Sequence, residues 1–327
     1  LYERENGMIE IILLIIILLF VTLVFVREVR KKNSAEDLGG IVEAADRGDA
    51  AAKKIIDTKY YGAAPEKLAT VRKRIYLPKA EKGDNFSQYQ MGLYYWLFEN
   101  DPVQAEKWFI EAANGGNIQA MKYLANGYSE GFNDSDITTA PMGFGLDEQQ
   151  EQKWWLQAAN MGDEEAMYNV GRKYYSLRNY EAAESWFHQA LKSKDCKIRM
   201  ETYEWLGRLY GNMVVQEFYD EKKCKAMLLE ALRQKNLQGI DTSTYDRDDF
   251  SRIARYLGER YENEYHYGTK SDKALSNAAY CYTLSYYAGD EDAAELIREL
   301  PYQASEAEST QWKQDSYTQN VNLPFAE

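Results

Sequence analysis

The chain carries a turn signal that recurs at nearly regular intervals, in which Gly is followed by an acidic or amide residue. These pairs are Gly48-Asp49, Gly83-Asp84, Gly116-Asn117, Gly162-Asp163 and Gly289-Asp290. The first three intervals are 35, 33 and 46 residues, and a period in the mid-thirties accommodates two helices and two turns. Gly can adopt the left-handed conformation that ends one helix, and the following Asp or Asn can cap the next. The spacing therefore predicts an array of two-helix repeats.

Five of the predicted first helices contain a small residue three positions before a Tyr, whereas the first unit has Asp57 before Tyr60 at the corresponding place. The pairs are Gly92 and Tyr95, Ala125 and Tyr128, Gly171 and Tyr174, Gly207 and Tyr210, and Gly258 and Tyr261. Residues three apart share one helix face, so the small residue lets a partner helix approach while the ring fills the gap one turn later. Because the pattern recurs with the repeat and does not converge on one place, it predicts core packing.

The predicted second helices share a different pattern, in which a Trp is followed four residues later by an Ala. The pairs are Trp108 and Ala112, Trp154 and Ala158, and Trp186 and Ala190. Residues four apart lie on one stripe of a helix, so we expect these stripes to be buried. Truncation of such a Trp to Ala typically costs about 3 to 5 kcal/mol.

The segment from Met8 to Val26 is apolar except for Glu10 and Thr22, and it has no amphipathic stripe. A run of this length can span a bilayer as a helix, so we predict a transmembrane segment over residues 8–26. The preceding residues, LYEREN, lack the net positive charge of a signal peptide, and no small-x-small cleavage site follows. We therefore expect the segment to be retained, and Met8 is a candidate for the native start.

Basic residues lie mainly on one side of this segment. Arg27, Arg30, Lys31 and Lys32 follow it, and only Arg4 precedes it. Lys and Arg beside a span stay on the cytoplasmic side, so we expect a single-pass protein of the inner membrane with its repeats in the cytoplasm.

The chain thus divides into five parts. They are a short flank 1–7, a transmembrane helix 8–26, a basic juxtamembrane linker 27–40, a repeat region 41–300 of about seven units, and a polar tail 301–327. One unit carries an insertion at residues 131–147. Insertions in repeat proteins often lie on the binding face, but a tolerated surface loop is an equal alternative.

Composition and motifs argue against several functions. With 52 acidic and 39 basic residues the net charge is −13, which disfavours nucleic acid as a partner. The sequence has no GxGxxG, Walker, HExxH or GxSxG motif. Residues 133–136 place oxygen ligands at alternate positions but lack the Gly and terminal Glu of a calcium loop. We expect no catalytic residue, no cofactor and no small-molecule substrate.

A zinc site is also not expected. Cys196, Cys224 and Cys281 form no CxxC pair, and His188 and His266 are the only nitrogen ligands available. The two histidines are expected at the surface. Scattered thiols in odd number favour a reducing compartment, which agrees with a cytoplasmic location.

Three strings carry a family resemblance: AEKWFIEAANGGNIQA, AMKYLANGYSEG and QKWWLQAANMGDEEAMYNVGRKYY. They resemble the Sel-one-like repeat (SLR) family, a relative of the tetratricopeptide repeat. The resemblance covers about Gly40 to Leu300 and is most specific between Ser87 and Lys194. It implies an all-α fold, a curved right-handed solenoid, and a role as an adaptor in membrane-associated complexes, signalling or host interaction without catalysis.

In arrays of this type the first helices line the concave face. The residues three before and one after each small residue are therefore candidates for partner binding. They are Tyr89, Leu93, Lys122, Asn126, Tyr168, Arg172, Arg208 and Arg255. The same two positions also hold Glu204 and Glu259. This track begins with aromatic residues and then carries one cation in each of four successive units. It predicts a groove for a protein partner with an acidic segment. The alternative is that these cations pair with neighbouring Glu side chains on a solvated face.

The sequence therefore favours a membrane-tethered interaction scaffold that also contacts the bilayer through residues 8–26. A second hypothesis keeps the repeats but places them in the envelope or outside the cell, where they contact a host. A third makes the chain a regulatory subunit of an enzyme complex. Membrane topology separates the first two hypotheses.

Overall fold

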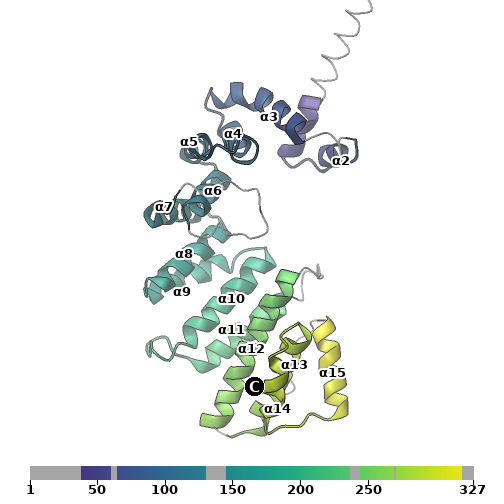
Figure 1. Ribbon diagram of the computed structural model, residues 1–327. Coiled ribbons are helices and arrows are strands. Elements are labelled where there is room, and N and C mark those ends of the chain that lie inside the picture. The colour runs from purple at the N-terminus through teal and green to yellow at the C-terminus, as the bar shows by residue number, and fades with distance from the viewer. Residues whose placement is uncertain (1–37, 60–64, 130–144, 236–243, 269, 319–327) are drawn as a thin grey trace, which may run out of the picture. The chain divides into compact units, whose positions relative to one another are not determined.

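A computed structural model describes residues 38–59, 65–129, 145–235, 244–268 and 270–318, and every regular element in these ranges is a helix (Figure 1). Residues 38–46 are helical and precede the first labelled helix. The labelled helices are α2 (Ala50–Lys59), α3 (Pro65–Ala80), α4 (Asn85–Leu97), α5 (Pro102–Asn114), α6 (Ile118–Tyr128), α7 (Glu148–Asn160), α8 (Glu164–Ser176), α9 (Tyr180–Ala190), α10 (Cys196–Tyr210), α11 (Glu221–Lys235), α12 (Thr244–Tyr267), α13 (Asp272–Tyr287), α14 (Ala293–Glu299) and α15 (Glu306–Thr318). The predicted all-helical fold is confirmed for this part of the chain.

The chain forms two compact units, and the division falls between Glu151 and Gln152, inside α7. In the first unit α3 packs against α4, α4 against α5, and α5 against α6. In the second unit three pairs of consecutive helices pack together as hairpins, namely α8 with α9, α10 with α11, and α12 with α13. One hydrophobic core includes residues from Tyr168 to Trp312. Packing between consecutive helices is what a two-helix repeat requires.

The predicted Gly turns have the expected backbone conformation. The φ angles of Gly48, Gly83, Gly116, Gly162 and Gly289 are 101°, 91°, 87°, 95° and 118°. The residue after the Gly caps the next helix at Asp84, Asn117 and Asp163, whose side chains accept hydrogen bonds from backbone N–H groups 2.9, 3.0 and 2.8 Å away. A side-chain oxygen in this position satisfies an N–H that the helix leaves unpaired.

The last of these pairs differs from the prediction. Asp290 caps no helix, because α14 begins three residues later at Ala293. Its carboxylate instead accepts a hydrogen bond from the Ser285 hydroxyl at 2.9 Å and lies 3.4 Å from Nη1 of Arg255. At this last Gly-Asp pair the Asp therefore links α12 and α13 and does not cap a helix.

The small residues of the first helices sit where a large side chain of the following helix approaches. A Cβ atom added at Gly92 or Gly171 would lie 2.5 or 2.6 Å from the ring of Phe109 or Phe187. At Gly258 the neighbour is the Tyr282 ring, at 2.6 Å, and at Gly207 it is the Leu228 side chain, at 2.8 Å. Carbon atoms in contact lie about 3.5 to 4.0 Å apart, so these positions have no room for a side chain.

The predicted Trp stripe is only partly correct. Trp154 is buried, with 2% of its surface exposed, as expected. Trp108 and Trp186 are only half-buried, whereas the next residues, Phe109 and Phe187, are fully buried at 0%. One residue turns the side chain by about 100° around a helix, and this rotation points the Phe at the Gly of the preceding helix.

The Tyr residues of the first helices connect successive hairpins. The Tyr128 hydroxyl donates a hydrogen bond to Glu106 of α5, and the Tyr210 hydroxyl donates one to Glu184 of α9 at 2.6 Å. Burial raises the pKa of both phenols, and their hydrogen bonds to carboxylates raise it further. Each Tyr therefore fills space in the core and also holds the second helix of the hairpin before it.

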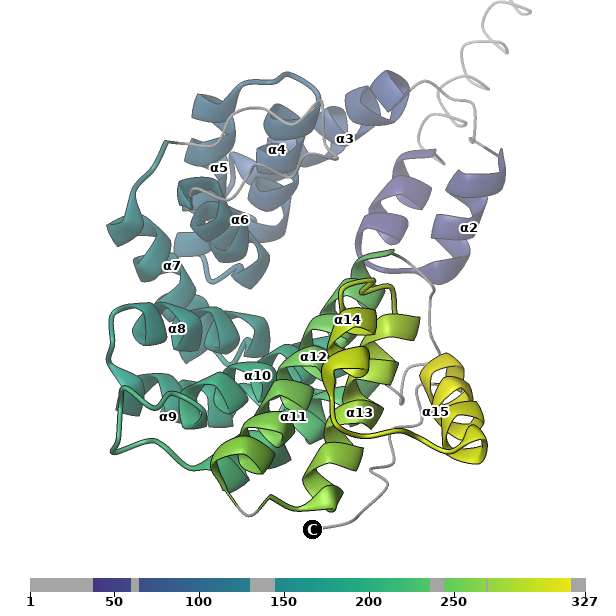
Figure 2. The same ribbon diagram turned by 60° about the horizontal axis from the view of Figure 1, so that its bottom comes forward.

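The region predicted as a polar tail contributes to the fold. Residues 306–318 form α15, which packs against α13 (Figure 2). Trp312 is 5% exposed, with its ring 5.7 Å from that of Tyr280 and 6.4 Å from that of Tyr302. Among residues 306–315, whose burial the structure describes, only Trp312 and Asp315 are buried, so the sequence of this helix shows little hydrophobic periodicity.

Two predictions concern residues outside the described ranges. The first is the transmembrane segment 8–26. Among the helices that the structure does describe, none is long and apolar enough to cross a membrane. The second is the insertion 131–147, most of which also lies outside the described residues. At its end the backbone N–H of Asp147 donates to the carbonyl of Tyr128 at 3.1 Å, so the insertion returns to the end of α6.

Candidate binding groove of the second unit

A groove of about 690 Å³ lies over the first helices of the second unit, α8, α10 and α12. It is lined by Tyr175, Trp205, Arg208, Gly211, Asn212, Arg252, Arg255, Tyr256 and Glu259. Three arginines and one glutamate give this lining a positive formal charge, in a chain whose net charge is −13. The groove thus combines aromatic surface with an excess of cations.

Trp205 is the aromatic centre of the groove. The guanidinium carbons of Arg172 and Arg208 lie 5.5 and 5.4 Å from its ring centroid, within the range of a cation–π interaction. The ring of Tyr175 meets it edge-on at 5.2 Å between centroids. These contacts hold the aromatic and guanidinium planes in place before any partner binds.

A buried carboxylate orients two of the arginines. The side chain of Glu204 is only 5% exposed, and its Oε1 accepts a hydrogen bond from Nε of Arg208 at 3.0 Å. Arg252 also donates to Glu204, and its other terminal nitrogen lies 2.7 Å from Asp249. Burial lowers the pKa of Arg252, although nearby Tyr168 and Glu201 oppose this effect. Glu204 is therefore the positioning residue on which both guanidinium groups depend.

Arg255 is also paired with acidic residues. It lies 3.4 Å from Glu259, one turn along α12, and 3.4 Å from Asp290 beyond α13. Arg208 and Arg255 keep 39% and 37% of their side chains exposed, so both remain accessible from the groove. The arginines therefore pair with Glu and Asp side chains, as the alternative of a solvated face predicts. They are also partly exposed, and Arg208 contacts the Trp205 ring.

Three of the four residues predicted in this unit lie at the groove. Arg208 and Arg255 line it, and Arg172 is exposed on α8 with its guanidinium toward Trp205. Tyr168 is different, because it is 7% exposed and its ring packs 6.5 Å from that of Phe187 in the core. Arg255 occupies the same position relative to its Gly and lines the groove, so the burial of Tyr168 depends on the helices packed around α8.

The four residues predicted in the first unit lie on α4 and α6. Tyr89, Leu93, Lys122 and Asn126 are all half-buried. The ring of Tyr89 lies 6.1 Å from that of Phe109 and 5.8 Å from that of Tyr123, and burial raises its pKa. Tyr89 therefore takes part in packing between helices, which reduces what it can offer a partner.

Six groove residues were not predicted from the sequence, namely Tyr175, Trp205, Gly211, Asn212, Arg252 and Tyr256. Trp205 and Tyr256 each stand two before the Gly of their helix, and Tyr175 stands four after its Gly. Positions two before, one after and four after a reference residue share one helix face. Adding the positions two before and four after the Gly to the position one after it would have found three of these six.

Comparisons with known proteins bear on the fold. No family model matches the sequence, and no curated protein matches it. One similar structure is a protective antigen present in uropathogenic Escherichia coli strains, described as displaying an SLR fold, with 19% identity and a TM-score of 0.53. The match covers 90% of this chain and 60% of that one. A Sel1 repeat protein from Oxalobacter formigenes matches with 18% identity and a TM-score of 0.46, over 84% of this chain and 98% of that one. The first likeness shows that the chain has an SLR-type repeat fold.

Proposed function

We propose that this chain is a non-catalytic scaffold that binds a protein partner through the groove on α8, α10 and α12. We further propose that its repeats form a curved right-handed solenoid, and that residues 8–26 tether it to the inner membrane with the repeats in the cytoplasm. The observation that carries the binding role is the groove itself, in which oriented arginines surround an aromatic centre. The tether rests on the apolar run and its basic flank alone.

The chemistry of the groove favours a partner segment with carboxylates and apolar side chains. Guanidinium groups bind carboxylates through parallel hydrogen bonds, which are among the stronger polar contacts in proteins. Trp205, Tyr175 and Tyr256 supply flat surface for the apolar part of such a segment. Arg and aromatic residues are enriched where a few residues supply most of the binding energy. An acidic extended or helical segment fits both features.

The pairing of the arginines determines which substitutions test this proposal. Reversing the charge of Arg208 would place two carboxylates together at buried Glu204, and the protein could lose stability for that reason alone. Arg208→Gln avoids this, because Arg252 still pairs with Glu204. Arg172 is exposed, and burial raises the pKa of the nearby Glu201, an effect that the charge of Arg172 opposes. Arg172→Glu is therefore used together with a check of the helical content of the variant.

We expect Arg172→Glu/Arg208→Gln to reduce recovery of the partner by at least about tenfold, the effect of losing roughly 1.4 kcal/mol of binding. The intact protein is purified from its native membrane, bound proteins are identified by mass spectrometry, and recovery is compared with the wild type. Recovery by the wild type should also fall as salt rises, because the contacts are between charges.

The control is Lys192→Glu/Lys194→Gln, which makes the same change of charge at two exposed residues after α9. It should leave recovery unchanged, and both variants should keep the helical content of the wild type. Undiminished recovery with the groove variant would exclude the groove, and the insertion 131–147 would become the next site to test.

Topology is tested with reporters fused after Glu327. A fusion to green fluorescent protein should fluoresce and a fusion to alkaline phosphatase should be inactive, because the first folds in the cytoplasm and the second needs export. The opposite pattern would support the alternative of an envelope or host-contact module. A mature chain that starts beyond Val26, found by N-terminal sequencing, would show that the segment is cleaved.

A further inference from the structure

A second hollow of the second unit has a volume of about 340 Å³. It is lined by Met213 and Tyr219, from the loop between α10 and α11, and by Tyr267 and Gly268, at the end of α12. Met213 and Tyr267 are 66% and 88% exposed, although both have large and mainly apolar side chains. Large apolar side chains that gather around a hollow and face water indicate an interaction surface.

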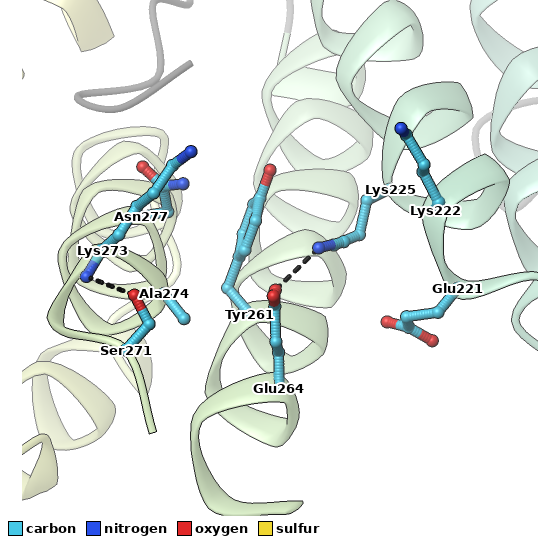
Figure 3. A pocket seen from close by; sticks show the side chains of 9 residues that line it. All are labelled: Glu221, Lys222, Lys225, Tyr261, Glu264, Ser271, Lys273, Ala274 and Asn277. Atoms are coloured by element: carbon cyan, nitrogen blue, oxygen red, sulfur yellow. Dashed lines mark hydrogen bonds and ion pairs between the residues drawn. The ribbon is translucent and has the colours of Figure 1, made fainter. Parts of the chain in front are cut away.

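The acidic residues of this lining are paired with buried cations of α11 and α12. Glu221 pairs with Arg260, whose side chain is 9% exposed and also lines the hollow. Glu264 accepts a hydrogen bond of 2.7 Å from Nζ of Lys225, which is 7% exposed. Figure 3, a close view of the neighbouring pocket between α11, α12 and α13, shows this second pair as a dashed line. Because the formal charges of these pairs cancel, the hollow favours an uncharged, apolar group.

The groove and this hollow meet at two places. In the loop after α10, Gly211 and Asn212 line the groove, and the next residue, Met213, lines the hollow. Along α12, Glu259 lines the groove, and Asn263, one turn further on, lines the hollow. Residues four apart share one face of a helix, so a chain that lies in the groove can continue along α12 over the hollow.

We propose that the bound partner segment has two parts: an acidic part that lies in the groove, and a large apolar side chain beside it that fills the hollow. This inference rests on the proposed function, because it extends the same bound segment. Tyr and Met are enriched at the centre of protein interfaces, where a few buried anchors supply most of the binding energy.

The length of α12 sets the distance between the two parts. From Arg255, in the groove, to Glu264, at the hollow, the helix rises by about 13 to 14 Å. An extended segment covers this distance in about four residues, since a strand rises by about 3.3 Å per residue. The apolar anchor therefore stands about four residues from the carboxylate that the groove binds.

The test is fluorescence anisotropy of the full-length protein with a matched pair of labelled synthetic peptides. Both peptides carry a run of glutamates and a spacer of Gly and Ser, and the fourth residue from the run is Phe in one peptide and Ala in the other. The pair is made with this residue after the run and again before it, which covers both directions of the segment. In one direction we expect the Phe peptide to bind at least about tenfold more tightly, because its ring leaves water in the hollow.

Two double variants locate this gain. Met213→Ser/Tyr267→Ser should remove it and leave the affinity for the Ala peptide unchanged. Met161→Ser/Tyr286→Ser changes the same two residue types elsewhere in the unit and should bind both peptides as the wild type does. All four residues are exposed, so the melting temperature of either variant without peptide should stay that of the wild type.

The outcomes separate this inference from the proposed function. If the Ala peptide binds and the groove variant Arg172→Glu/Arg208→Gln weakens it, but Phe adds no affinity, the groove stands and the apolar anchor is wrong. A gain from Phe that persists in Met213→Ser/Tyr267→Ser would also overturn the inference. An oligomer that this variant dissociates, measured by analytical ultracentrifugation, would assign the hollow to a second copy of the chain. If neither peptide binds, or the groove variant binds both as the wild type does, the proposed function itself fails.

Discussion

Replacing Phe187 with Ala should reduce the free energy of unfolding of the second unit by about 3 to 5 kcal/mol, the range measured for large-to-small changes of a buried aromatic. Phe187 is fully buried, and its ring lies between Gly171 on α8 and Trp205 on α10. Removing the ring would leave a cavity where α8, α9 and α10 meet. Because repeats are stabilised by their neighbours, the loss should extend to the adjacent hairpin.

The measurement is chemical denaturation followed by circular dichroism, with Trp186→Ala as the matched control. Trp186 is one residue earlier on α9 and has the larger side chain, but it is only half-buried. It should therefore cost clearly less than Phe187→Ala. If Trp186→Ala lowered the free energy of unfolding as much as Phe187→Ala or more, the buried core residue of α9 would be Trp186, as the sequence pattern predicted.

A Val in place of Gly171 should destabilise the second unit by about 1 to 3 kcal/mol, as overpacking of a core usually does. The added Cβ would lie 2.6 Å from the Phe187 ring, so the ring or the helix must move. This cost is expected although Val has a higher helix propensity than Gly. The control is Gly40→Ala in the helix at residues 38–46, where nothing lies within 4 Å of the added Cβ, and it should stabilise the protein by about 0.5 to 1 kcal/mol.

Combining Gly171→Val with Phe187→Ala tests the contact itself. The small side chain at residue 187 makes room for the Val, so the double variant should be more stable than the sum of the two single effects predicts. Residues in direct contact commonly couple by about 0.5 to 3 kcal/mol. Strict additivity in this cycle would mean that the close approach of α8 and α9 is not what requires Gly at residue 171.

The sequence by itself determined the features that depend on local backbone conformation. A Gly with positive φ and the following cap act within one turn, so Gly83 and Asp84 could be interpreted without knowing any neighbour. The small residues of the first helices were identified for a similar reason. Their partner lies in the next helix of the same hairpin, and the pattern recurs in each repeat.

Only the tertiary structure decided what each side chain faces beyond its own hairpin. Around a helix one residue changes the direction of a side chain by about 100°, so the packing of neighbouring helices chose Phe187 over Trp186 for the core. The groove depends on contacts between residues far apart in sequence, such as the hydrogen bond from Arg252 to Glu204, which are 48 residues apart. A contact of this kind has no local signature, because it depends on how successive hairpins stack and not on the conformation of either segment.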